Sequence, residues 1–164
     1  MSSLFELCNW INNTVSSTAI RESVLVFPII EGTHLLAIGV SAGTIALTDL
    51  RLMGIIMKKD PASKVLHSVL PFSIGGFIVV LITGSLLFWA EAAKSYRNPW
   101  FRFKLLFLVF AGLNALIFHT GIYRRMKLWD NDDTPPAKAR MAGAMSLLLW
   151  ATVIWLGRQF AYSS

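Results

Sequence analysis

The sequence contains little charge and almost no cysteine. Only 15% of its 164 residues are Asp, Glu, Lys or Arg, whereas soluble proteins contain about 25%. The single cysteine, Cys8, excludes a disulfide within the chain and an iron–sulfur centre held by clustered cysteines. The sequence also lacks a P-loop, a dinucleotide-binding glycine motif and a Ser-His-Asp set. These absences argue against an ordinary soluble enzyme.

Hydrophobic residues make up 55% of the chain and gather in four long runs. A helix needs about 20 mostly apolar residues to cross the hydrocarbon core of a bilayer. The four runs cover residues 23–50, 65–90, 103–123 and 141–160. We therefore predict an all-α membrane protein, a four-transmembrane-helix bundle in which residues 1–164 form a single membrane domain.

The first 18 residues have a different character. They lack the basic start and the continuous apolar stretch of a cleavable signal peptide. Leu4, Leu7, Ile11 and Val15 instead recur at helical spacing. This pattern is typical of an amphipathic helix that lies on a membrane surface. We predict such an interfacial helix over residues 1–18.

The distribution of Lys and Arg indicates the orientation. Nine of them lie in the first and third loops between the spans, against six in the second loop and the tails. Because cytoplasmic loops carry the excess of positive charge, we predict a bacterial inner membrane protein with both termini on the periplasmic side. The same rule accounts for the net charge of +6 without a nucleic-acid partner.

Two histidines within the spans mark the candidate site, because ionisable residues at bilayer depth are costly and usually face a bundle interior. His34 lies in the first span, one helical turn after Glu31, and His119 lies late in the third span. At about 1.5 Å of rise per residue, His34 lies roughly 16 Å and His119 roughly 22 Å below the outer surface. The two imidazoles are therefore expected at similar depths, as axial ligands of haem iron in a helical bundle would be.

This arrangement predicts a b-type haem-binding subunit that transfers electrons between a quinone and an outer-face redox partner. His34 and His119 are the expected axial ligands of haem b. Arg158, at the outer end of the fourth span, is expected to bind a haem propionate or a carboxylate. Glu31 is expected to hydrogen-bond near the ligands, to pair with Arg158 or to handle protons.

Two rival classes stay open. The same histidines, together with Glu31, would suit a copper-binding or copper-transporting protein, since imidazole ligates copper. A structural subunit without a cofactor would instead use small-residue faces, at Gly39 and Gly43 and at Gly75 and Gly76, to pack against other helices. Such faces favour a homo-oligomer or membership of a larger membrane complex. In this second class each histidine hydrogen-bonds a neighbouring helix.

We also predict the surroundings of four further polar residues. His67 lies at the inner boundary of the second span and is expected to be solvated rather than a ligand. Asn114 is expected to make a hydrogen bond between helices. Asp49 and Arg51 end the first span, where their charges are expected to reach water or lipid headgroups.

Several short motifs carry a resemblance. They are E-x-x-H at residues 31–34, D-L-R-L-x-G at residues 49–54 and N-x-x-x-F-H at residues 114–119. Together they resemble an uncharacterised family of bacterial four-span integral membrane proteins, a domain of unknown function, over residues 3–162. The resemblance implies four spans but brings no assigned reaction. The polar positions that match it are Glu31, His34, Asn114, His119 and Arg158.

Overall fold

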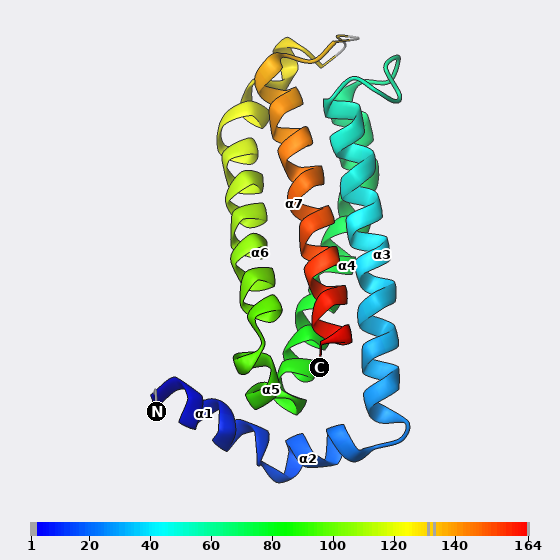
Figure 1. Cartoon of the computed structure of the whole chain (residues 1–164). Helices are drawn as coiled ribbons and strands as arrows, with labels where there is room; N and C mark the ends of the chain where they lie inside the picture. Colours follow the sequence, from blue (N-terminus) through cyan, green and yellow to red (C-terminus); the bar gives the residue numbers. More distant parts are fainter. Residues whose placement is uncertain (1–2, 131, 133, 164) are drawn as a thin grey trace.

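The computed structural model describes residues 3–130, 132 and 134–163, and four of its helical segments are long and apolar enough to cross a membrane (Figure 1). These spans are α3 (Val26–Leu52), α4 (Ala62–Ala90), the run Pro99–Leu128 and α7 (Ala137–Tyr162). The run Pro99–Leu128 consists of α6 (Pro99–Ile117), a π-helical turn η1 (Phe118–Ile122) and a 3₁₀ helix η2 (Tyr123–Leu128). The predicted all-α bundle of four membrane spans is confirmed.

The third span begins four residues earlier than predicted, at Pro99. Asn98 caps it, since its side-chain oxygen accepts a hydrogen bond from the backbone N–H of Trp100 at 2.9 Å. Proline suits the first helical turn because its missing N–H would have no partner there. A cap and a proline therefore start this helix among polar residues, which a hydropathy pattern cannot locate.

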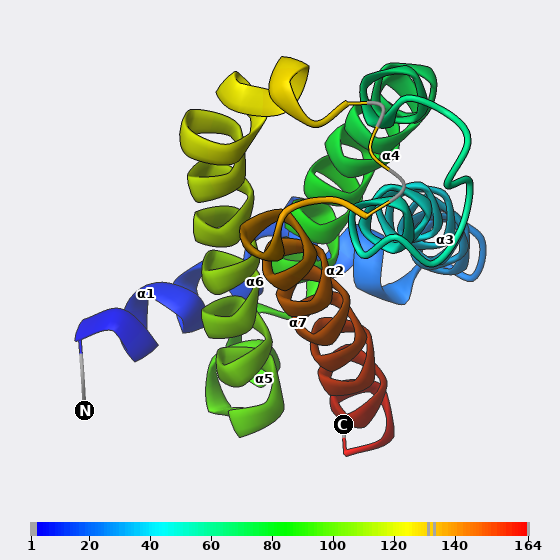
Figure 2. The same cartoon turned by 90° about the horizontal axis from the view of Figure 1, so that it is seen from above.

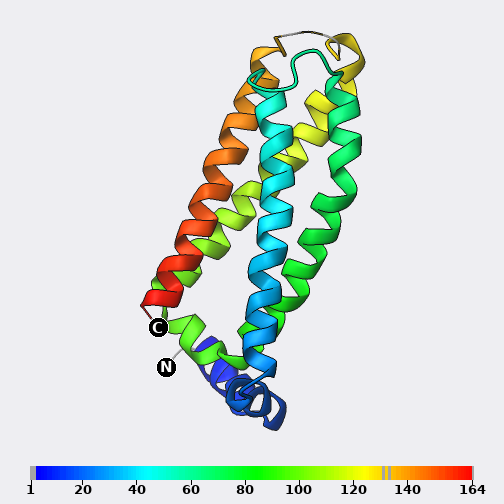
Figure 3. The ribbon, with the colours of Figure 1, turned by 90° about the vertical axis from the view of Figure 1, so that its right-hand side faces the viewer.

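The four spans are joined side by side in the order α4, α3, α7 and α6. Helix α3 packs along both α4 and α7, and α6 packs along α7. Seen from above, α7 lies between α6 and α3 (Figure 2). Helix α6 is inclined to α3 (Figure 3). Helices α4 and α6 meet near one end of the bundle, where the rings of Phe88 and Phe101 stack with centroids 5.7 Å apart.

Three short helices lie across the end of the bundle that carries the N-terminal segment, called the terminal end below (Figure 1): α1 (Ser3–Asn12), α2 (Val15–Glu22) and α5 (Ala92–Arg97). The predicted interfacial helix is thus two helices. Thr14 starts the second one, because its hydroxyl accepts a hydrogen bond from the backbone N–H of Ser17 at 3.3 Å. On α1, Trp10 is 68% exposed, as a side chain that rests in a membrane surface would be.

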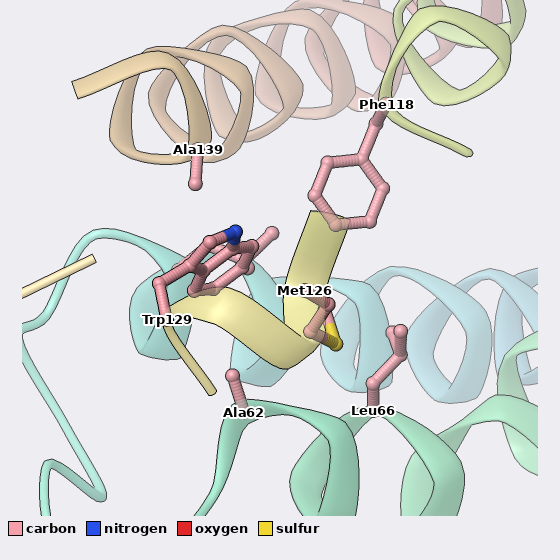
Figure 4. Close-up of a cluster of buried hydrophobic side chains, with 7 residues drawn as sticks. Ala62, Leu66, Phe118, Met126, Trp129 and Ala139 are labelled. Carbon is pink, nitrogen blue, oxygen red and sulfur yellow. The ribbon is translucent and has the colours of Figure 1, made fainter. Parts of the chain in front are cut away.

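The opposite end, called the loop end below, holds the main cluster of buried hydrophobic side chains (Figure 4). The cluster joins α3, α4, η1, η2 and α7, and its members are Leu52, Ala62, Leu66, Phe118, Met126, Trp129 and Ala139. The π-helical turn and the 3₁₀ helix bring Phe118 and Met126 back over the bundle. This cluster closes the loop end.

Arg51 ties the two loops of this end together. Its Nε donates to the carbonyl oxygen of Asp60 at 3.0 Å, and its Nη2 donates to that of Asp132 at 3.3 Å. The side chains of Asp49 and Arg51 are only 5% and 1% exposed, so the prediction that they reach water or headgroups is wrong. Residues two apart on a helix do not share a face. Arg51 therefore faces the loops, and Asp49 faces the bundle.

Close helix contacts occur at two glycines. A Cβ atom on Gly143 of α7 would lie 2.8 Å from the backbone oxygen of Asp49, and one on Gly76 of α4 would lie 3.0 Å from the backbone nitrogen of Ser41. By contrast, a Cβ on Gly39 or Gly43 would meet no other group within 4 Å. The expected close approach is thus found at Gly76, whereas the Gly39 and Gly43 face packs against no helix within the described residues.

We expect Gly143→Ala to destabilise the protein and Gly39→Ala not to. The new methyl group at 143 meets a backbone oxygen, which cannot move away easily, and overpacking of this kind costs about 1–3 kcal/mol. At 39 the methyl group meets open space, and alanine favours a helix by about 1 kcal/mol over glycine. Thermal unfolding of the purified variants in detergent measures both effects. Equal changes in Tm for the two variants would contradict the close approach of α3 and α7.

Candidate functional site

A cavity of about 330 Å³ lies in the half of the bundle nearer the loop end. Leu52, Leu66 and Phe118 belong both to its lining and to the hydrophobic cluster, so the cluster forms one end of the cavity. At the other end Phe77 of α4 meets Trp150 of α7 edge-on, with ring centroids 6.3 Å apart. Small-molecule pockets in proteins measure about 300–1,000 Å³, so this cavity suits a small ligand.

The cavity is partly open, and its open side faces the surroundings of the bundle between α4 and α6. Ile74 and Ile78 of α4 line it and are each 51% exposed. From α6, the exposed residues Gly112 and Ala115 also line it. Because these helices pack on α3 and α7, the gap between them gives the cavity a side entrance at membrane depth.

Asp49 is the most unusual group in the lining. Its side chain is buried, and among the described residues nothing donates a hydrogen bond to its Oδ2 atom. Ser146 of α7 lies close enough for a side-chain hydrogen bond to the carboxyl group. An acceptor left without a partner in an apolar environment is costly. Asp49 is therefore ready to bind a donor that enters the cavity.

Two other polar residues line the cavity from the third span. Asn114 donates from Nδ2 to the carbonyl oxygen of Ala142 at 3.1 Å, which confirms the predicted hydrogen bond between helices. The exposed ring of His119 lies against that of Tyr123, with centroids 5.4 Å apart. Tyr123 in turn places its hydroxyl oxygen 3.4 Å from Nε2 of His67, whose side chain is exposed as predicted.

His34 lies outside this cavity and links α3 to α4. Its Nδ1 is 2.8 Å from the hydroxyl oxygen of Thr83, which also lies 2.6 Å from the carbonyl oxygen of Val79. The tautomer of the imidazole ring sets which of Nδ1 and the hydroxyl group is the donor. A Cβ on Gly84 would lie 3.1 Å from Cε1 of His34, so this glycine allows the ring to approach α4.

The two histidines are not brought together. His34 comes eight residues after the start of α3 and His119 twenty residues after the start of α6. These intervals correspond to about 12 Å and about 30 Å from the terminal end. The first span begins later in the sequence than predicted, and the third span begins earlier. His34 is therefore shallower, and His119 deeper, than expected from the sequence. The two histidines lie at different positions along their helices, which gives the shared haem ligation no support.

From the sequence, His119 is the expected second ligand near His34. The structure places Lys104 of α6 near His34 instead. Its Nζ would lie 3.5 Å from a Cβ on Gly157 of α7, and it interacts electrostatically with His34. Copper would need further ligands beside His34, and the lysine in that place is not a typical copper ligand. Within the described residues, no three side chains of His, Cys, Asp or Glu come together as a metal site.

Glu31 and Arg158 are both exposed and do not meet. Arg158 donates from Nη2 to the hydroxyl oxygen of Tyr162 at 2.6 Å, and its guanidinium carbon lies 5.0 Å from the centroid of the same ring. In the described part of the chain, no ion pair joins Arg158 to Glu31. Neither residue lines the cavity.

Asp49 and Ser146 were missed as site residues in the sequence. Asp49 was assigned to the water-exposed end of the first span, although it lies within the D-L-R-L-x-G motif. The signal was therefore present in that motif. From the sequence alone, however, Asp49 looks like an ordinary charged residue at a helix end. Its role becomes visible only when the positions of α7 and Arg51 are known.

Comparison with protein families supports the resemblance found in the motifs. Residues 23–163 match the family described as a family of unknown function (DUF6644). The chain belongs to this family. The match covers all residues that line the cavity. No curated protein and no solved structure matches the chain. Because the DUF6644 family has no assigned reaction, the function has to be argued from the site.

We expect a lipid-soluble carbodiimide to label Asp49. Dicyclohexylcarbodiimide adds to carboxyl groups and partitions into bilayers, so it reaches the cavity from the membrane. The adduct is located by mass spectrometry of peptides, and it is expected to be absent from Asp49→Asn and retained in Glu31→Gln. A water-soluble carbodiimide is expected to leave Asp49 unlabelled. Labelling of Glu31 without labelling of Asp49 would show that the cavity does not open to the bilayer.

Proposed function

We propose that this protein binds a lipid-soluble small molecule within the bilayer and recognises its polar head with Asp49, Asn114 and His119. The observation that carries the proposal is the cavity in which a buried carboxylate oxygen lacks a hydrogen-bond partner. Polar residues inside a membrane are costly and are usually functional. A bound head group that donates to Asp49 removes this cost.

The composition of the cavity supports a ligand with an apolar body. Most of the lining consists of Leu, Ile, Val, Ala and aromatic side chains, and the polar groups are few. This combination is typical of small-molecule sites, in which apolar walls supply affinity and a few polar groups fix orientation. The side entrance between α4 and α6 supports access from the bilayer rather than from water.

A quinone in its reduced form is the occupant that connects this site with the electron transfer predicted from the sequence, because the hydroxyl groups of the reduced form can donate to Asp49. It is flat and lipid-soluble, and binding it in the cavity does not require His34 and His119 to share an iron atom. Haem b and copper stay untested predictions, as does assembly with a second copy or a larger complex. With both termini proposed on the periplasmic side, the cavity lies in the cytoplasmic half of a bacterial inner membrane.

Filling the cavity tests the proposal. A Cβ on Gly112 meets no other group within 4 Å, so Gly112→Phe adds a ring beside the entrance without a backbone clash. Leu116→Phe is the matched control, since Leu116 lies on the same helix, is 58% exposed and does not line the cavity. Small molecules that co-purify with each variant are extracted and quantified by mass spectrometry. We expect Gly112→Phe to lose about tenfold or more of the bound molecule, a change of about 1.4 kcal/mol or more.

Two results would count against this function. One is an equal content of co-purified molecule in Gly112→Phe and Leu116→Phe. The other is a wild-type protein that is folded and carries no bound molecule after purification in mild detergent.

A further inference from the structure

The carboxylate of Asp49 lacks a hydrogen-bond donor. Its Oδ2 atom is an acceptor in a side chain that is only 5% exposed, and the described residues offer it no hydrogen bond. A ligand whose head carries only acceptor oxygens, such as an oxidised quinone, leaves an ionised carboxylate unsatisfied. A ligand head with an N–H group satisfies it.

No cationic side chain among the described residues pairs with Asp49. Arg51 directs its Nε and Nη2 to backbone oxygens of the two loops, and its buried Nη1 has no hydrogen-bond partner among these residues. Lys104 lies in the other half of the bundle, against α7 and near His34. A cationic ligand pairs with the ionised carboxylate, and this pairing offsets the cost of burying its charge.

Aromatic rings line the same cavity as Asp49. Phe77, Phe118 and Trp150 all line the cavity, and Phe77 meets Trp150 edge-on. The faces of aromatic rings attract cations within about 6 Å, and tryptophan does so most strongly. The carboxylate and the rings together form a site of the kind that binds ammonium groups.

We propose that the cavity selects a lipophilic amine, a protonated amino group on an apolar body, whose N–H donates to Asp49. This inference rests on the proposed function and narrows it to one class of ligand. The ammonium group lies at Asp49 within the cavity that the aromatic rings line, and the apolar body extends towards the entrance between α4 and α6.

Binding of tritiated decylamine to the full-length protein in detergent tests the selection. Unlabelled decylamine, decanol and decylubiquinone serve as competitors of similar chain length. We expect decanol and decylubiquinone to compete at least about tenfold more weakly than decylamine, because hydrogen bonds to charged groups are worth more than neutral ones.

Asp49→Asn removes the charge while keeping the shape, and it is expected to weaken decylamine binding by about tenfold or more. Glu31→Gln is the matched control, since Glu31 lies on the same helix, bears the same charge and does not line the cavity. Its effect is expected to stay within about threefold. Thermal unfolding of each variant shows that the loss of binding does not come from loss of the fold.

Failure of the inference is distinguishable from failure of the proposed function. In one outcome, all three compounds compete equally, and binding is unchanged in Asp49→Asn but lost in Gly112→Phe. That result would overturn the selection of an amine and leave ligand binding in the cavity standing. Binding that survives Gly112→Phe, or no saturable binding of any compound, would overturn both.

Discussion

The burial of two opposite charges on opposite sides of α3 is the constraint on which the loop half of the molecule depends. Arg51 donates from Nε and Nη2 to the carbonyl oxygens of the two neighbouring loops, and it thereby holds the starts of α4 and α7 at this end, although its Nη1 has no partner among the described residues. The helical repeat then turns Asp49 towards the bundle, where the described residues leave its Oδ2 atom unpaired. Arg51 thus closes the loop end of the bundle, and Asp49 supplies a polar group to the cavity.

The spans are held by close contact rather than by a conventional hydrophobic core, because lipid tails are as apolar as leucine. Gly143 brings α7 against the backbone of α3 at Asp49, and Gly76 brings α4 against α3 at Ser41. Both contacts involve α3, which packs between α4 and α7. Helix α6 reaches the bundle mainly through α7 and is inclined to α3. The space between α6 and α4 remains as the entrance of the cavity.

Hydropathy predicted the four spans because each contains a long apolar run, and the spacing of Leu4, Leu7 and Ile11 predicted the surface segment. Two of the local hydrogen bonds, at His34 and Asn114, were anticipated as alternatives to ligation. The difference in depth between His34 and His119 was not predictable, because helix ends set by a cap at Asn98 lie outside the apolar run. The role of Asp49 depends on α7, which is distant in sequence.

The central claim is that a molecule from the bilayer occupies the cavity and satisfies Asp49. The most direct measurement is a crystal structure grown in a lipidic mesophase from protein purified with its native lipids. We predict electron density for a bound molecule between α4 and α6, with a donor atom in contact with Oδ2 of Asp49. A cavity filled by side chains of the protein, with both carboxylate oxygens of Asp49 bonded to groups of the chain itself, would contradict the account.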